Sequence, residues 1–205
     1  SSDAFLALAP LFAREAVAAA VFGEDERGRM AALELLALGS RLIVCTPEAL
    51  AEPMPLPGDY AQRTQRFTVG STIGREKVLA KLAHAGYQRV DFVESPGEYA
   101  ARGAVVDFYG LEPLVAVRML FDEDTLVSMR TFDSTTQATL DFVGEAKAVP
   151  AASPEGETIP AGRLSDWIGA GSLWIIPEGL EISAPEGAET WRAVVGELPG
   201  DLDFG

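Results

Sequence analysis

The hydrophobic pattern of the first fifty residues alternates between helical and strand character. Residues 4–22 are rich in Ala and Leu, which predicts a helix. A charged loop at 23–28 precedes an apolar-periodic stretch that predicts a second helix, of about ten residues, ending at Gly39. The apolar run 41–46 predicts a short buried strand, and a further helix follows through Leu50. This order of elements is typical of an α/β fold.

The pattern changes at residues 51–60, which contain three prolines and one glycine. This composition predicts a linker or long loop, and we place a domain boundary there. A strand over 65–70 and a helix over 74–85, capped by Gly86, are predicted next.

Beyond the helix, short β-forming runs follow one another with turn residues between them. Such runs predict an antiparallel meander with the preceding helix packed on one face, which is an α+β module. The predicted strands are 89–94, 101–110, 115–122 and 126–133.

The pattern weakens again after residue 149. A loop, a helix over 161–170, a strand over 172–177 and an acidic tail over 181–205 are predicted. The predicted domains are 1–60, 61–155 and 156–205.

Charge and cysteine content limit the possible partners and compartment. The formal net charge is −15, whereas phosphate binding draws on clusters of Lys and Arg, so no direct contact with nucleic acid is expected. No apolar run approaches the roughly 20 residues that span a bilayer, so no membrane insertion is expected. A single cysteine, Cys45, excludes an internal disulfide and favours a cytoplasmic protein. Because the chain does not begin with Met, we interpret it as a piece of a longer protein.

Motifs that suggest catalysis or cofactor binding are weak. The stretch 70–77, GSTIGREK, resembles a phosphate loop, but the lysine does not follow the second glycine directly, which favours a plain loop-to-helix junction. His84 is the single histidine, so the common His/Cys zinc sites are excluded. The acidic run 122–124 is expected in a solvated turn. We therefore expect no cofactor, no metal and no enzymatic activity; an enzyme that uses clustered carboxylates is the least favoured alternative.

Arg102 is the candidate that the pattern leaves unexplained. If residues 101–110 form one strand, alternation places Arg102 on the face of Phe108, with Asp107 on the other face. Two interpretations remain open. The arginine forms a structural ion pair with a neighbouring acid such as Glu98, or it points toward a partner.

Several motifs within residues 85–151 resemble the UvrB-homology region of the bacterial transcription-repair coupling factors (Mfd) and, more distantly, domain 2 of UvrB. Any one of them is weak, but their order along the chain is specific. They are the GY-x-R-V-D lead at 86–91, P-G-E-Y-A-x-R-G at 96–103, V-D-F-Y at 106–109, a strand that starts at Arg118, and RTFD…TQ at 130–137.

In that family the module is a non-catalytic docking surface for UvrA, and its flanks form a degenerate helicase-like (RecA-like) remnant. The resemblance implies that Arg89 and Arg102 present guanidinium groups to UvrA, while Tyr99 and the strand around Phe108 supply contact area. It also implies that other domains of the parent chain, an ATP-dependent DNA translocase, mask this surface until the motor engages.

Two positions depart from the family pattern. Ala100 stands where UvrB has an additional arginine, and Leu120 stands where an acid is usual. These departures predict a weaker or rewired electrostatic contact. They also motivate an alternative hypothesis, in which UvrA binding is lost and the module is an intramolecular scaffold or autoinhibitory clamp.

Overall fold

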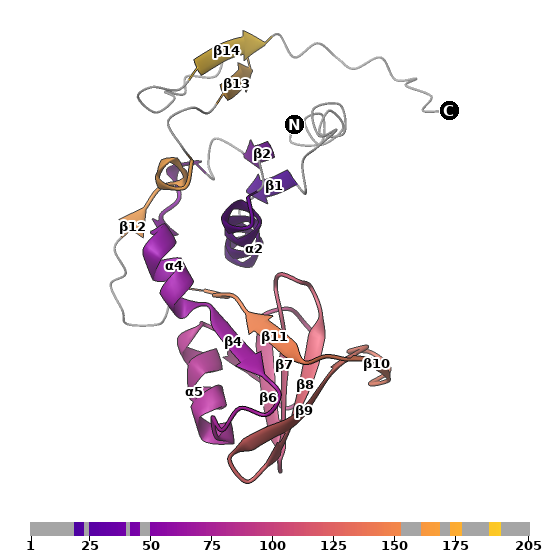
Figure 1. Ribbon diagram of the computed structural model, residues 1–205. Helices are drawn as coiled ribbons and strands as arrows, with labels where there is room; N and C mark the ends of the chain where they lie inside the picture. The colour runs from indigo at the N-terminus through magenta and orange to yellow at the C-terminus, as the bar shows by residue number, and fades with distance from the viewer. Residues whose placement is uncertain are drawn as a thin grey trace.

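The main body of the computed structural model is a curved β-sheet with a helix on one face (Figure 1). The structure describes residues 19–22, 25–39, 42–45, 50–152, 161–168, 173–177 and 189–193. No helix in these ranges is long and apolar enough to cross a bilayer.

The N-terminal elements form a small β-α-β unit. Strand β1 (Ala19–Phe22) pairs in parallel with β2 (Leu42–Cys45), and helix α2 (Glu26–Ala37) connects them. The second helix and the short strand of the sequence analysis are confirmed, although Ile43 and Cys45 of this strand are half-buried and not buried. The helix predicted over 4–22 is wrong at its end, because pairing with β2 overrides the helical propensity of alanine; its first part lies outside the described residues.

The segment predicted as a linker contains secondary structure. Strand β3 (Met54–Pro55) pairs with β12 (Ala161–Gly162), and helix α4 (Pro57–Arg63) follows. The loop prediction for 51–60 is wrong because Pro57 begins a helix, a position where the missing N–H costs nothing.

The C-terminal predictions are confirmed only in part. The helix predicted over 161–170 is a 3₁₀ turn at Leu164–Asp166 in its described part. Strand β13 (Leu173–Pro177) is confirmed, and β14 (Glu189–Ala193), in the predicted tail, pairs with it in parallel.

The central sheet has the strand order β10-β9-β8-β7-β6-β5. Strands β6 to β10 form an antiparallel meander, as predicted, but β10 lies outside the predicted runs; β5 runs parallel to β6 and contains only two residues. The strand predicted over 89–94 is therefore wrong beyond Arg89, and a loop follows. The strands are β5 (Gln88–Arg89), β6 (Glu98–Arg102), β7 (Val105–Tyr109), β8 (Ala116–Asp122), β9 (Thr125–Phe132) and β10 (Thr139–Phe142).

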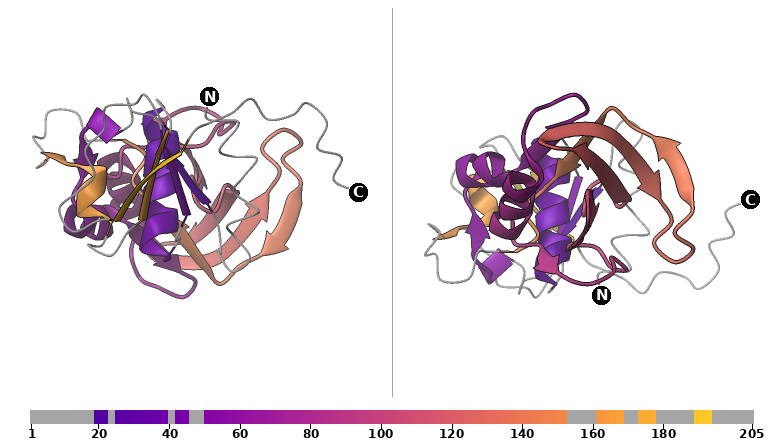
Figure 2. Two further views of the ribbon diagram at one scale, coloured as in Figure 1. Left: turned by 90° about the horizontal axis from the view of Figure 1, so that it is seen from above. Right: turned by 90° about the horizontal axis from the view of Figure 1, so that it is seen from below.

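Helix α5 (Arg75–His84) covers one face of this sheet, as the sequence predicted. The fully buried Val78 and Leu82 of the helix belong to one core with Phe108 and Met119 of the sheet. A further antiparallel pair, β4 (Gln65–Thr68) with β11 (Glu145–Ala148), completes the module. Seen from below, the sheet curves away from the helices toward the edge that carries β10 (Figure 2).

Helix α2 is joined to the sheet module by side-chain contacts that cross the predicted boundary at residue 60. Lys147 of β11 forms an ion pair with Glu34, and both side chains are largely buried. Arg27 donates from Nη1 to the carbonyl of Pro96, at 2.9 Å. On the N-terminal side of this boundary, the buried Tyr60 hydroxyl of α4 donates to the carbonyl of Met30, also at 2.9 Å. Burial raises the pKa of Tyr60, so its hydroxyl stays protonated as a donor.

Candidate functional site

Residues 98–109 form a β-hairpin rather than one strand. The chain turns at Gly103 and Ala104, and Gly103 has a φ of +57°, which glycine adopts without strain. Arg102 is therefore the register partner of Val105. Register partners point to the same face, so Arg102 shares a face with Asp107 and not with Phe108. The face predicted for Arg102 was wrong because a turn inverts the alternation.

Asp107 holds two arginines on this face. Its carboxylate is 2% exposed and accepts from Arg102 Nη2 at 3.0 Å. Arg118 of β8 forms a bidentate pair with it, with Nε and Nη2 each 2.8 Å from one carboxylate oxygen. Glu98, the ion-pair partner first considered for Arg102, instead accepts from the backbone N–H groups of Glu94 and Ser95. A buried carboxylate thus fixes two guanidinium groups at defined positions.

Arg118 is held from three sides. Besides Asp107, its Nη2 donates to Gln137 Oε1 at 2.7 Å, and its guanidinium lies 4.4 Å from the ring centroid of Phe132. The hydrogen bonds that Arg118 donates to Asp107 raise the pKa of Arg118 above its ordinary value, although desolvation opposes the shift.

The RTFD…TQ motif builds the loop that supplies Gln137. Asp133 Oδ1 accepts from the backbone N–H groups of Thr135 and Thr136 at 3.0 and 2.6 Å, and from the Thr136 hydroxyl at 2.9 Å. These bonds stabilise the carboxylate and lower the pKa of Asp133, chiefly through Thr136. Gln137 follows with a φ of +63° and returns its side chain to Arg118. The motif is thus a scaffold for the arginine.

Arg102 differs from Arg118 in its exposure. Its side chain is 41% exposed, and its guanidinium stacks at 4.6 Å over the ring of Phe92, which is itself exposed in the loop after β5. Leu120, the register partner of Val105 on β8, is 42% exposed. We call this side of the sheet the outer face. By register it carries Ala100, Arg102, Val105, Asp107, Arg118, Leu120, Ser128 and Arg130.

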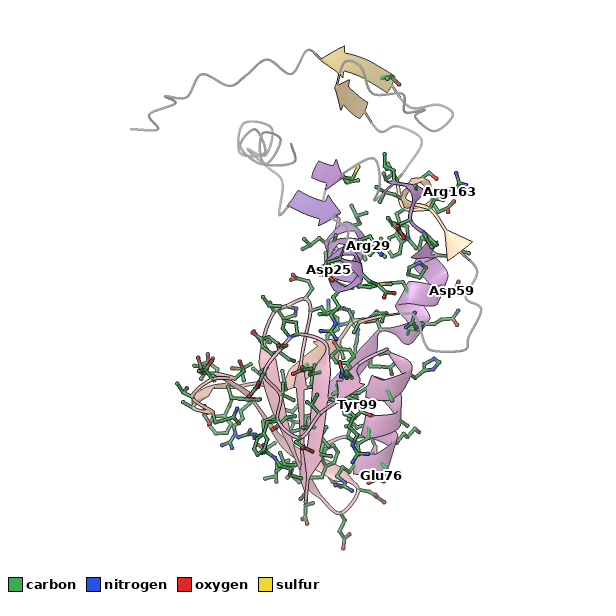
Figure 3. The ribbon with its side chains drawn as sticks, turned by 180° about the vertical axis from the view of Figure 1, so that it is seen from behind. Asp25, Arg29, Asp59, Glu76, Tyr99 and Arg163 are labelled. Atoms are coloured by element: carbon green, nitrogen blue, oxygen red, sulfur yellow. The ribbon has the colours of Figure 1, made fainter. Side chains whose placement is uncertain are left out.

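The four site residues suggested by the sequence do not lie together. Arg89 is exposed on β5, opposite Tyr99 in the register. Tyr99 lies on the side of the sheet that faces α5 (Figure 3), and both Tyr99 and Phe108 are buried. Their side chains support the sheet from inside, so exposed contact area beside Arg102 comes from Phe92 and Leu120 instead.

The sequence reasoning missed Asp107, Arg118 and Gln137 as members of the site. The signal was present, because V-D-F-Y and RTFD…TQ were both recognised. Their connection depends on strand register, which brings residues 107, 118 and 137 together from three parts of the chain.

Other candidate chemistry is not supported. At the start of α5, a Cβ on Gly74 would lie 3.0 Å from the Asp124 carboxylate, so a carboxylate lies beside the glycine of the loop that resembles a phosphate loop. The described residues contain no group of three or more metal-ligating His, Cys, Asp or Glu side chains. Burial raises the pKa of Cys45 to about 11, which leaves the thiol protonated and weakly nucleophilic at neutral pH.

The outer face therefore presents an arginine beside an exposed aromatic ring, residue types that are enriched at protein interfaces. The comparisons with known proteins agree: residues 66–153 match the family model described as the UvrB interaction domain. The resemblance recognised in the sequence is thereby confirmed.

The relatives are repair proteins. The chain is 39% identical over 82 residues to the transcription-repair-coupling factor of Haemophilus influenzae, and 37% identical over 82 residues to that of Escherichia coli. Each alignment covers 40% of this chain but only 7% of the relative. The UvrABC system protein B of Methanothermobacter thermautotrophicus is 27% identical over 146 residues, which are 71% of this chain and 22% of that protein. The chain thus spans a small part of the proteins that it matches.

Proposed function

We propose that this chain is a non-catalytic docking region for UvrA in a transcription-repair coupling factor, and that it links a stalled RNA polymerase to nucleotide excision repair. The observation that carries the proposal is the outer face, where a buried carboxylate holds Arg102 in an exposed position beside Phe92. Arginine and aromatic side chains are typical of binding hot spots.

Pre-organisation explains how this face would bind a partner. A free arginine side chain loses rotamer freedom when it docks, and the loss weakens binding by about 0.5 to 1.5 kcal/mol. Asp107 and the Phe92 ring hold Arg102 in one conformation before the partner arrives. Because one carboxylate faces two arginines, a positive charge remains for an acidic group of the partner.

The test is a titration of this chain with UvrA from the same organism, by calorimetry or fluorescence. Arg102→Ala should weaken binding by about 1 to 4 kcal/mol, as truncated hot-spot arginines do. Arg89→Ala tests the second arginine that the family resemblance implies. Arg66→Ala is the matched control, because Arg66 is exposed on β4, outside the outer face. Equal affinities for all four proteins would contradict the proposal.

A second candidate function is supported by Leu120, the apolar residue at the usual position of an acid. In this alternative, UvrA binding is lost and the outer face packs against another domain of the parent chain as a scaffold or autoinhibitory clamp. Leu120→Asp separates the two functions. If the wild-type chain does not bind UvrA and Leu120→Asp does, the clamp is favoured; if the wild-type chain binds, the docking function stands.

A further inference from the structure

Strand β10 forms one edge of the sheet and exposes apolar side chains there. All four of its residues are exposed, with Leu140 at 60% and Phe142 at 76%, the largest value among the exposed large hydrophobic residues of the described ranges. It contains neither Lys nor Pro, residues that often protect an edge strand from pairing. β10 lies on the far side of the sheet from α5 (Figure 1).

The backbone of β10 is oriented for pairing. The N–H of Asp141 donates to Thr131 Oγ1 at 3.2 Å, and the N–H of Val143 donates to the carbonyl of Met129 at 3.1 Å. Backbone groups of successive residues alternate in direction except where the register shifts, between Thr139 and Phe142. Because the N–H of the next residue, Val143, faces β9, the backbone groups of Phe142 point away from β9, toward the open edge.

Phe142 also lies in one register row with residues of the outer face. One row of register partners runs from Asp107 through Arg118 and Arg130 to Phe142. The exposed ring therefore stands at the end of the row that contains the buried carboxylate. A partner that covers Arg102 and extends along this row would reach Phe142.

We propose that the β10 edge is a second contact region for UvrA, which adds an extended segment to the edge and packs an apolar side chain against Phe142. This inference rests on the docking function proposed above and adds a site that the motifs do not include. Strand addition uses main-chain hydrogen bonds for affinity and side-chain contacts for specificity.

A second copy of this chain is a less suitable occupant. Antiparallel pairing of two β10 edges centred on Asp141 would bring the two Asp141 carboxylates close together. Like charges that face each other across strands are destabilising. A heterologous segment with a neutral or basic residue at that position avoids this repulsion.

The first experiment compares UvrA binding by the wild-type chain, Phe142→Ser and Leu114→Ser. Leu114 is a matched control, because it is 60% exposed in the loop between β7 and β8. We expect Phe142→Ser to raise the Kd at least tenfold with an unchanged melting temperature, and Leu114→Ser to leave the Kd unchanged. If Arg102→Ala weakens binding and Phe142→Ser does not, the edge contact is wrong while the docking function stands. If the wild-type chain does not bind at all, both proposals fail.

The second experiment tests strand addition directly. The amide of Phe142 should exchange rapidly in the free chain and become protected when UvrA is added, as measured by hydrogen exchange with NMR detection. Unchanged exchange at this amide in the complex would overturn the proposal. Sedimentation of the chain alone gives a further check, because dimerisation that Phe142→Ser abolishes would assign the edge to a second copy instead.

Discussion

Arg102 and Asp107 lie on consecutive strands of one hairpin, and Arg102 Nη2 is 3.0 Å from Asp107 Oδ2. One member of the pair is almost completely buried and the other is 41% exposed. The buried carboxylate therefore has a structural role that can be separated from the surface role of the arginine, and each can be tested by its own substitution.

Asp107→Ala should lower the free energy of unfolding by about 2 to 4 kcal/mol. The substitution leaves Arg118 largely buried with no carboxylate to accept its two hydrogen bonds, and removing one partner of a buried pair is strongly destabilising. Urea denaturation measures the change. Asp122→Asn is the control, because Asp122 is exposed on the same sheet and a surface substitution changes stability by about 0.5 kcal/mol or less.

Arg102→Ala should change the free energy of unfolding by less than about 1 kcal/mol, because exposed ion pairs contribute little and Arg118 still satisfies Asp107. The same denaturation experiment measures it. A loss above about 2 kcal/mol would show that Arg102 is mainly a structural ion-pair residue, which is the interpretation that competes with partner binding.

Gly97→Ala should destabilise the chain more than Gly103→Ala. Both glycines have a positive φ, +81° and +57°, where a side chain costs about 1 to 2 kcal/mol. Only at Gly97 would the new Cβ also meet a neighbour, the Arg27 guanidinium at 3.1 to 3.3 Å, and displace it from the carbonyl of Pro96. Thermal unfolding compares the two variants, and an equal loss in both would mean that the Arg27 contact contributes nothing.

Acidification should release the loop that holds Gln137. The pKa of Asp133 in the folded chain is lowered from its ordinary value of 3.8. The stabilisation of the loop by its carboxylate is therefore fully present above pH 3.8 and is lost as the pH falls through the folded-state pKa. The backbone amide resonances of Thr135 and Thr136 should therefore shift at a pH below 3.8, with the rest of the sheet still folded. Asp133→Asn should remove the transition, and a midpoint above 3.8 in the wild-type chain would contradict the assignment.

The Glu34–Lys147 pair should show a large coupling in a double-mutant cycle. Glu34→Gln alone leaves the ammonium of Lys147 largely buried without its counter-ion and should cost about 2 to 4 kcal/mol. Glu34→Gln combined with Lys147→Met should cost less than the sum of the single substitutions, since both charges are then gone. Additive losses, measured by urea denaturation, would show that the pair does not connect α2 to β11.

The sequence predicted where most strands of the meander lie better than it predicted which face of the sheet each side chain points to. Periodicity and turn residues located helix α5, strand β4 and the hairpin runs because local chemistry dominates there. The turn at Gly103 and Ala104 was missed because Arg-Gly-Ala is not a strong turn sequence, and one missed turn reversed the face assigned to Arg102. The prolines before Tyr60 indicated a loop, since Pro57 looks the same in a loop as at the first position of a helix.

The motifs that contain the candidate site could be recognised in the sequence, but the contacts between their side chains could not be predicted from it. Arg102 could be named because its motif is specific. Its network could not be named, because Arg118, the second partner of the Asp107 carboxylate, comes from β8, and Gln137, which accepts from Arg118, comes from the loop after β9. Those partners follow only from register, which a single sequence does not specify when the turns are ambiguous.

Helix α2 lies outside the segment that matches the family, residues 66–153, yet Arg27 and Glu34 attach it to that segment. The segment that matches the family model is thus shorter than the portion that these contacts hold together. A truncated protein that began at residue 61 would lose Tyr60 and the counter-ion of Lys147, and we expect it to express poorly and to aggregate. Recombinant fragments intended for crystallisation or inhibitor screening should therefore begin before α2.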